Sequence, residues 1–267
     1  MENIRSDHHP GAALPDLHTT EAYRLTADDI QALDPDLAIL PVGSLEQHGP
    51  HLPIMTDWAI AAELGSRVAK ATGGFLLPAL PVSTCREHMG KKGSVWMEPP
   101  TFYHMMNDMI LSLKIQGFRK VAILQCHGGT FIMTPLVRDL NAKYNPQLMV
   151  ANIDICSIFP LLHQEGIIET NTELHAGEIE TSMMLSIAPE TVHMDRAVDC
   201  VPDVPRPYLS YGSIFRASPS GVWGEPSKAS ASKGDRILAR TAELILREMN
   251  SAFSYMEAKE TFNYSHF

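Results

Sequence analysis

LAILPVGSLEQHGPHLPIMTD, residues Leu37–Asp57, is the stretch that decides the fold. It opens with a short apolar run, Leu37–Val42, which is typical of a buried strand. The residues after Val42 are rich in glycine and proline and carry acid and imidazole side chains. An apolar strand that runs directly into such residues indicates a rigid backbone that presents ligands at the carboxyl edge of a sheet, where α/β proteins bind them.

Similar apolar segments recur along the chain and alternate with helical patterns. We predict further strands at Phe75–Leu80, Val121–Cys126 and Leu148–Ile155, of which the first is weakened by Pro78. Continuously apolar strands that alternate with helices predict a mainly parallel sheet covered on both faces. The fold class is therefore α/β.

Helical patterns fill the segments between and after these strands. We predict helices at Thr56 to about Lys70, Thr101 to Gln116, from about Thr134, His175–Ile187 and Asp235 to about Tyr255. Thr101 is the expected N-cap of its helix, and the glycine after Gln116 is the expected C-terminal stop. Residues 209–234 form a long loop, and long loops in compact domains are often functional.

The composition places limits on the kind of protein. The chain has 267 residues, 45% of them hydrophobic and 19% charged, with a net charge of −10. We expect a flexible arm over residues 1–22 and a single domain over residues 23–267. The acidic balance argues against nucleic acid as a partner, and no apolar run approaches the ~20 residues that span a membrane. Without a secretory leader pattern, we expect a cytoplasmic protein with a small-molecule substrate.

Four residues from two neighbouring strand ends form the main candidate site. Glu46 and His48 are two apart in an extended segment and so point the same way. Asp57, at the start of a helix, could bridge two cations, and His127 follows the strand Val121–Cys126. Two carboxylates and two imidazoles suit zinc, manganese or iron. The alternative is that these side chains cap helices and form surface ion pairs.

Two further polar clusters carry candidate catalytic and substrate-binding side chains. ELHAGEIETS (173–182) and CREHMGKKGS (85–94) contain no metalloprotease motif. In the first, a carboxylate could act as general base and an imidazole could protonate the substrate, or the acids could simply favour the first turn of a helix. In the second, Glu87 and His88 could support the site. Cys85 could be an inert buried thiol, and Lys91 with Lys92 could form a solvated turn.

Taken together, these segments resemble the creatininase (creatinine amidohydrolase) family over residues from about 25 to 250. GSLEQHGPHLPIMTD is similar to the family signature GSxEQHGPHLPLxTD, and CREHMGKKGS is similar to SxEHxxFPGT. QCHGGT resembles NGHGGN, ELHAGEIETS resembles DxHAGxxETS, and GVWGEPSKASASKG resembles GVxGDPxxAxxEKG. The first signature is long and specific, so it favours the metal site over the surface alternative.

The resemblance implies a three-layer α/β/α fold, a dinuclear metal centre and a homo-hexamer. It implies hydrolysis of non-peptide C–N bonds in cyclic amides or formamides, with two divalent ions of zinc, manganese or iron. The ligands implied are Glu46, His48, bridging Asp57 and His127. Creatininase has a further glutamate ligand where this chain has Gly129, so either that position is open or Glu180 supplies the carboxylate.

The resemblance also suggests roles around the metals. We expect Glu173 or Glu178 to carry the proton of the attacking water, and His175 to stabilise the oxyanion or protonate the leaving nitrogen. The expected substrate-binding residues are Cys85, His88, Lys91 and Trp223, although Trp223 could equally belong to the core.

Departures from the family pattern bear on the substrate. Lys91 and Lys92 replace a Phe-Pro pair, and Gly128 replaces a substrate-contacting tyrosine, so we expect an anionic substrate other than creatinine. The competing hypotheses are a metallopeptidase of the same family and a noncatalytic flavodoxin-like binding module with structural metal. The missing GxGxxG and Walker A motifs argue against nucleotide binding.

Overall fold

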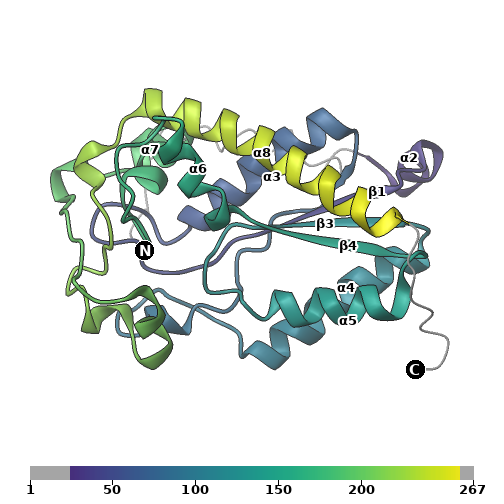
Figure 1. The fold of residues 1–267 in the computed structure, drawn as a ribbon, viewed down its shortest axis with the longest axis horizontal. Coiled ribbons are helices and arrows are strands. Elements are labelled where there is room, and N and C mark those ends of the chain that lie inside the picture. The colour runs from purple at the N-terminus through teal and green to yellow at the C-terminus, as the bar shows by residue number, and fades with distance from the viewer. Residues whose placement is uncertain (1–24, 259–267) are drawn as a thin grey trace, which may run out of the picture.

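A computed structural model describes residues 25–258 and shows a parallel sheet with helices on both sides (Figure 1). The sheet has strand order β2-β1-β3-β4, and all neighbours are parallel. The strands are β1 (Leu37–Val42), β2 (Phe75–Leu76), β3 (Lys120–Gln125) and β4 (Met149–Asp154). The predicted α/β class with a parallel central sheet is confirmed.

Two apolar cores lie on opposite faces of the sheet. On one face, Ile39 of β1 packs in a core that includes residues of α3, α7 and α8; on the other, Leu40 packs in a core with α4 and α5. Successive residues of a strand point to opposite faces, so a strand covered on both sides must be apolar throughout. This explains the unbroken apolar run of β1.

The helices have the following bounds. The long ones are α3 (Thr56–Thr72), α4 (Pro99–Ile115), α5 (Met133–Tyr144), α7 (Glu178–Ile187) and α8 (Ala231–Glu257). Two shorter helices are α2 (Ala27–Leu33) and α6 (Phe159–Gln164). The 3₁₀ segments are η2 (Arg86–His88), η3 (Ile155–Ser157), η4 (Pro189–Thr191), η5 (Met194–Arg196), η6 (Arg206–Tyr211), η7 (Ile214–Arg216) and η8 (Pro226–Lys228).

Prolines account for two differences from the predicted boundaries. The strand predicted to reach Leu80 ends at Leu76, two residues before Pro78. Beyond it, Leu77 N still donates a hydrogen bond to Ile39 O, and Leu80 forms a bridge with Val42. The prediction that Thr101 caps its helix is wrong. Helix α4 begins at Pro99, because a proline in the first turn needs no hydrogen-bond acceptor for its nitrogen.

The helix predicted from His175 begins only at Glu178. His175 instead forms a backbone bridge with Trp223, with His175 N donating to Trp223 O at 3.0 Å and Trp223 N to His175 O at 2.8 Å. Ala176 then turns the chain with a φ of 54°. His175 is therefore held by a strand-like contact outside α7, so the prediction that this helix begins at His175 is wrong.

Two other expectations concern the ends and the surface of the chain. The arm predicted over residues 1–22 lies outside the described residues. Within residues 25–258, none of the helices combines the length and the apolar character needed to cross a membrane.

The layered core gives a stability prediction. Leu40 is fully buried between the sheet and its covering helices, whereas Ile115 at the end of α4 is 86% exposed. We expect Leu40→Ala to lower the free energy of unfolding by roughly 2–5 kcal/mol, because it removes packed methyl groups and leaves a cavity. Ile115→Ala should change it by less than about 0.5 kcal/mol. Urea unfolding of both variants measures this, and equal effects would contradict the layered core.

Candidate metal centre

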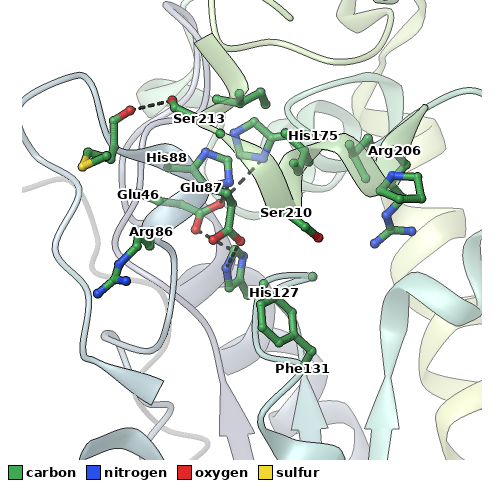
Figure 2. Close-up of a pocket in the computed structure, with 18 of the residues that line it drawn as sticks. Glu46, Arg86, Glu87, His88, His127, Phe131, His175, Arg206, Ser210 and Ser213 are labelled. Carbon is green, nitrogen blue, oxygen red and sulfur yellow. Dashed lines mark hydrogen bonds and ion pairs between the residues drawn. The ribbon is translucent and has the colours of Figure 1, made fainter. Parts of the chain in front are cut away.

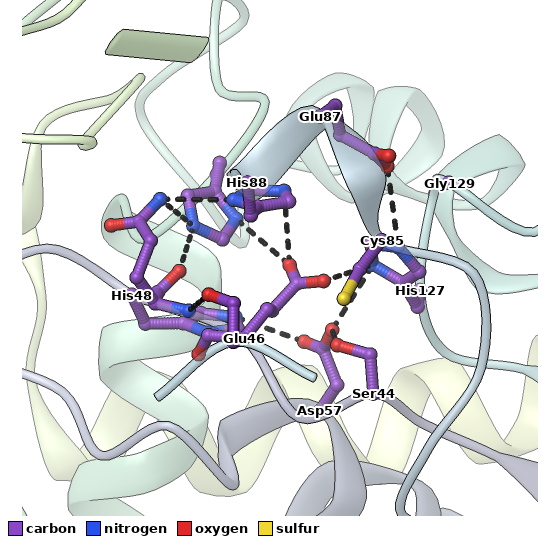
Figure 3. Close-up of polar contacts among 12 residues, drawn as sticks. Ser44, Glu46, His48, Asp57, Cys85, Glu87, His88, His127 and Gly129 are labelled. Atoms are coloured by element: carbon purple, nitrogen blue, oxygen red, sulfur yellow. Dashed lines mark hydrogen bonds and ion pairs between the residues drawn. The ribbon is translucent and has the colours of Figure 1, made fainter. Parts of the chain in front are cut away.

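The carboxyl ends of β1 and β3 place the candidate ligands at one edge of the sheet. Val42 and Gln125, the last residues of these strands, are paired across the ladder. The loop with Glu46 and His48 therefore leaves the sheet beside the loop with His127. Asp57 lies in the first turn of α3, and Ser44 Oγ donates a hydrogen bond of 3.0 Å to its Oδ2 (Figure 3).

Asp57 lies between the two imidazoles of this group. Its Oδ1 is 3.0 Å from His48 Nε2, and its Oδ2 is 3.2 Å from His127 Nδ1. His127 Nδ1 is also 3.1 Å from Glu46 Oε2. One carboxylate oxygen beside each imidazole is the arrangement that a carboxylate bridging two ions needs.

The outer nitrogens of the imidazoles fix which nitrogens can bind an ion. His48 Nδ1 lies 3.1 Å from the carbonyl oxygen of Glu46, and His127 Nε2 lies 2.9 Å from that of Thr84. A carbonyl only accepts, so these two outer nitrogens carry protons, and the inner nitrogens are the ones that can offer a lone pair to an ion once they are deprotonated. A lone pair that faces a carboxylate oxygen needs a cation or a proton between them, and metal-binding histidines are oriented in this way.

Burial makes the charge balance of this group demanding. Glu46, His48, Asp57 and His127 are all at most 5% exposed. Burial lowers the pKa of His48, but Asp57, Glu180 and Glu46 outweigh burial and raise it to about 10. Burial also raises the pKa of Asp57, but His48 and His127 hold it below its usual range. Buried carboxylates need compensating positive charge, which protons or divalent ions can supply.

The Glu46 carboxylate shows that the donor set fits a metal. Both of its oxygens are buried and lack a hydrogen-bond partner among residues 25–258. His88 Nε2 and His127 Nδ1 each come within 3.1 Å of one of them, yet neither contact has hydrogen-bond geometry. Buried polar atoms are rarely left without a partner, and side chains that share an ion approach one another in this way.

Three overlapping sets of side chains could hold an ion. In each set, one donor atom per residue lies within 4.8 Å of the others. The sets are Glu46 with His48 and Asp57, His48 with His175 and Glu180, and Glu46 with His88 and His175. His127 stands outside these sets, although its Nδ1 lies beside two of the carboxylates.

Glu180 reaches this group from the first turn of α7. Its Oε2 is 3.7 Å from His48 Nε2 and accepts a hydrogen bond from Ala176 N at 2.5 Å. Burial, with Asp57 and Glu46, raises the pKa of Glu180 to about 7, although His48 opposes the shift. Glu180 is therefore the carboxylate that the structure brings to the His48 side.

His88 and His175 complete the group and are oriented by Gln47. Gln47 Nε2 lies 2.9 Å from His88 Nδ1, and the Gln47 carbonyl oxygen lies 2.7 Å from His175 Nε2. His175 Nδ1 then faces Glu46 Oε1 at 3.7 Å. Gln47 and Ser44 were missed as functional residues, although both lie inside the opening motif.

The structure does not bring the remaining acids of ELHAGEIETS to the metal group. The Glu173 carboxylate accepts a 2.9 Å hydrogen bond from Ile179 N and so caps α7, and it lines a second cavity. Glu178 is fully buried and pairs with Lys233 Nζ at 2.6 Å. The ion pair with Lys233 accounts for the buried charge of Glu178, which indicates a structural role.

Three of the predicted substrate-binding residues do not line the cavity that opens over the metal group, although Cys85 lies close to the group (Figure 3). The buried thiol of Cys85 faces backbone carbonyls, and Trp223 lines the second cavity. Lys91 Nζ donates to Ser220 O at 3.2 Å and lies 5.0 Å from the ring centre of Phe215. His88 is the one of the four that lies beside Glu46.

A cavity of about 560 Å³ opens over the metal group (Figure 2). Its floor includes Glu46, His127 and His175. Its walls come from η2, from the loop after β3 and from η6, and they include Arg86, Glu87, Phe131, Arg206 and Tyr211. Part of the predicted functional loop, residues 209–214, lines this cavity. Phe131 and Arg206 carried no sequence signal, because only the fold brings them to the site.

The chain combines an α/β fold with a cavity over a cluster of acid and imidazole side chains. Comparison with known proteins identifies the family to which it belongs. The family model for creatininase, described as creatinine amidohydrolase, matches residues 23–249. The chain belongs to the creatininase family, and it is a hydrolase of that family.

Several relatives are similar over most of their length. A 3-dehydro-scyllo-inosose hydrolase of Thermotoga maritima is 28% identical over 82% of this chain and 79% of the relative. A mycofactocin precursor peptide peptidase of Mycobacterium ulcerans is 30% identical over 77% and 81%. A creatinine amidohydrolase of Pseudomonas putida is 27% identical over 75% and 83%. Each of these names describes the relative alone.

Solved creatininase structures share the fold. A manganese form superposes with a TM-score of 0.75 over 86% of this chain and 97% of that chain, at 24% identity. A zinc–zinc form of a creatininase variant superposes with a TM-score of 0.74 over the same shares and at the same identity. At 24% identity this likeness establishes the fold alone. The zinc and manganese ions belong to those creatininase structures.

The charge balance of the cluster predicts proton release when metal binds. With a pKa of about 10, His48 of the metal-free protein is protonated at pH 7.5, and a ligand must lose that proton. We expect zinc binding at pH 7.5 to release at least one proton per chain, and to release fewer in His48→Ala. Calorimetry in buffers of different ionisation enthalpy measures this. Zinc binding without proton release would show that His48 is neutral in the metal-free protein.

Proposed function

We propose that this chain is a metal-dependent amidohydrolase that cleaves a non-peptide C–N bond in a cyclic amide or formamide. The observation that carries the proposal is the position of Asp57, with one oxygen beside His48 and the other beside His127. This geometry supports two divalent ions of zinc, manganese or iron. The creatinine amidohydrolase relative and the metal forms of creatininase support the same class of chemistry.

The side chains divide into two ligand sets that share Asp57. Glu46 and His127 would hold one ion, and His48 and Glu180 would hold the other. Bound divalent ions supply Lewis-acid polarisation of the substrate carbonyl and lower the pKa of water to ~7. In this proposal Glu180 supplies the carboxylate that creatininase has at the position of Gly129.

His175 is the proton carrier that the geometry favours. The 2.7 Å contact to the Gln47 carbonyl places its proton on Nε2, which leaves a lone pair on Nδ1 toward Glu46. In the metal-free protein, burial together with the charge of His48 lowers the pKa of His175, so the ring is neutral there. Nδ1 would take the proton of the attacking water and return it to the leaving nitrogen. Glu173 and Glu178, directed elsewhere, have no role in this step.

The substrate would carry an anionic group, bound by Arg206. Lys91 donates a hydrogen bond to Ser220 O and does not line the cavity. Arg86 lines the cavity, but its charge is paired with Glu98. Arg206 lines the cavity, is exposed, and has no ion-pair partner among the described residues. Its Nη2 lies 3.3 Å from the point where a Cβ at Gly128 would be, so it reaches the residue next to His127.

A metallopeptidase is the second candidate, because the relative at 30% identity is named a peptide peptidase. The cavity rim carries two exposed aromatic rings, Phe131 (71%) and Tyr211 (75%), on which a peptide side chain could pack. A noncatalytic binding module fits less well, because the cavity opens directly onto the unsatisfied oxygens of Glu46.

A substrate panel tests the reaction class. Zinc- and manganese-loaded protein should hydrolyse a lactam, imide ring or formamide, and His175→Ala should lower kcat by roughly 10²–10⁴-fold, the usual range for a lost proton carrier. Product mass spectrometry measures both. Matched peptides belong in the same panel, and activity confined to them would replace this proposal with the peptidase.

Arg206 gives a separate prediction about specificity. On an amide substrate with a free carboxylate, Arg206→Gln should raise KM roughly tenfold or more, because a charged hydrogen bond is worth about 1.5–3 kcal/mol. The matching carboxamide should show no change, and Arg86→Gln should change neither substrate. An equal rise of KM for both substrates in Arg206→Gln would mean that Arg206 shapes the cavity and does not bind the carboxylate.

A further inference from the structure

The space beside Gly129 is filled by the carboxylate of Glu87. A Cβ built at Gly129 would lie 1.8 Å from Glu87 Oε1 and 2.4 Å from His127 Nε2, far inside contact distance. Gly129 is buried, but its φ is not in the left-handed region, so the backbone does not demand glycine there. The side chains of Glu87 and His127 leave no room for a Cβ at this position.

Among the described residues, Glu87 forms one ion pair, with His127. Its side chain is 16% exposed, and its Oε1 lies 3.3 Å from His127 Nε2 (Figure 3). Lysine and arginine side chains of residues 25–258 form no ion pair with it. A largely buried carboxylate is costly unless it is paired, so its contact with His127 is the interaction that can explain its position.

The two loops that carry this contact are tied together. His127 Nε2 lies 2.9 Å from Thr84 O, and Thr84 Oγ1 donates a 2.9 Å hydrogen bond to Gly129 O. Glu87 comes shortly after Thr84 in the sequence and lies in η2. The segment with η2 thus contacts the outer nitrogen of the His127 ring through both Thr84 O and Glu87 Oε1.

We propose that Glu87 is a positioning residue for the metal ligand His127, and that Gly129 is glycine to make room for these two side chains. The Glu87 carboxylate and the Thr84 carbonyl share the proton on His127 Nε2. This keeps the Nδ1 lone pair aimed between Glu46 and Asp57 and makes the imidazole a better donor to an ion. The inference rests on the proposed metal centre and adds a residue to it.

Zinc affinity of the metal-free protein tests this inference without any substrate. Competition with a chromophoric chelator should show that Glu87→Ala weakens zinc binding roughly 10–100-fold, the usual effect of losing such a partner. Glu98→Ala is the matched control: this exposed acid pairs with Arg86 next to Glu87 and should leave zinc affinity unchanged.

The clash at Gly129 makes the test specific. Gly129→Ala alone should also weaken zinc binding, because its methyl group displaces the Glu87 carboxylate. In the double variant Glu87→Ala with Gly129→Ala, only the 2.4 Å contact with His127 Nε2 remains, so the second change should weaken zinc binding by less than it does in the unmodified protein. Glu87→Ala adds no atoms, so its zinc affinity keeps the test valid if the variants at Gly129 do not fold.

A spectroscopic readout separates positioning from packing. Nitrogen-15 NMR of the metal-free and zinc-loaded protein should show His127 protonated at Nε2 and zinc-bound at Nδ1, with the Nε2 proton resonance shifted in Glu87→Gln. Zinc affinity of Glu87→Ala within twofold of the unmodified protein, or additive effects in the double variant, would overturn the inference while leaving the metal centre intact. Absence of zinc binding by the unmodified protein would overturn both.

Discussion

The constraint on which the site depends is a buried carboxylate held between two imidazoles whose inner nitrogens face it. Asp57 can occupy that place only with positive charge beside both of its oxygens, because uncompensated charge in a dry interior is costly. The outer nitrogens of His48 and His127 face backbone carbonyls, so each inner nitrogen can face Asp57 only with a proton or an ion between them. Divalent ions meet this demand without rearrangement.

The rest of the fold serves to hold that arrangement rigid. Parallel pairing of β1 with β3 brings two loops to one edge, and the covering helices keep both strands dry on each face. The glycines at 128 and 129 have complementary uses. Gly128 leaves space that Arg206 approaches from the cavity wall, and Gly129 leaves space that Glu87 fills beside His127. A bare backbone at these positions allows other segments to supply charges there.

The sequence predicted what local patterns determine, and it failed where tertiary contacts decide. The apolar run of β1 and the motif after it were sufficient to predict the strand and to bring Glu46, His48 and Asp57 together. The helical pattern around His175 was misleading, because a bridge to a segment almost fifty residues away, at Trp223, takes it out of the helix. No local pattern could show that Glu178 would be buried against Lys233.

The most direct test of the account is the metal content of the purified protein after loading with zinc or manganese. Elemental mass spectrometry should find about two ions per chain, and Asp57→Ala should lose both, because the two ligand sets share that carboxylate. Asp108→Asn, which changes an exposed acid on α4, should keep both ions. One ion or none in the unmodified protein, or an unchanged count in Asp57→Ala, would contradict the bridged centre.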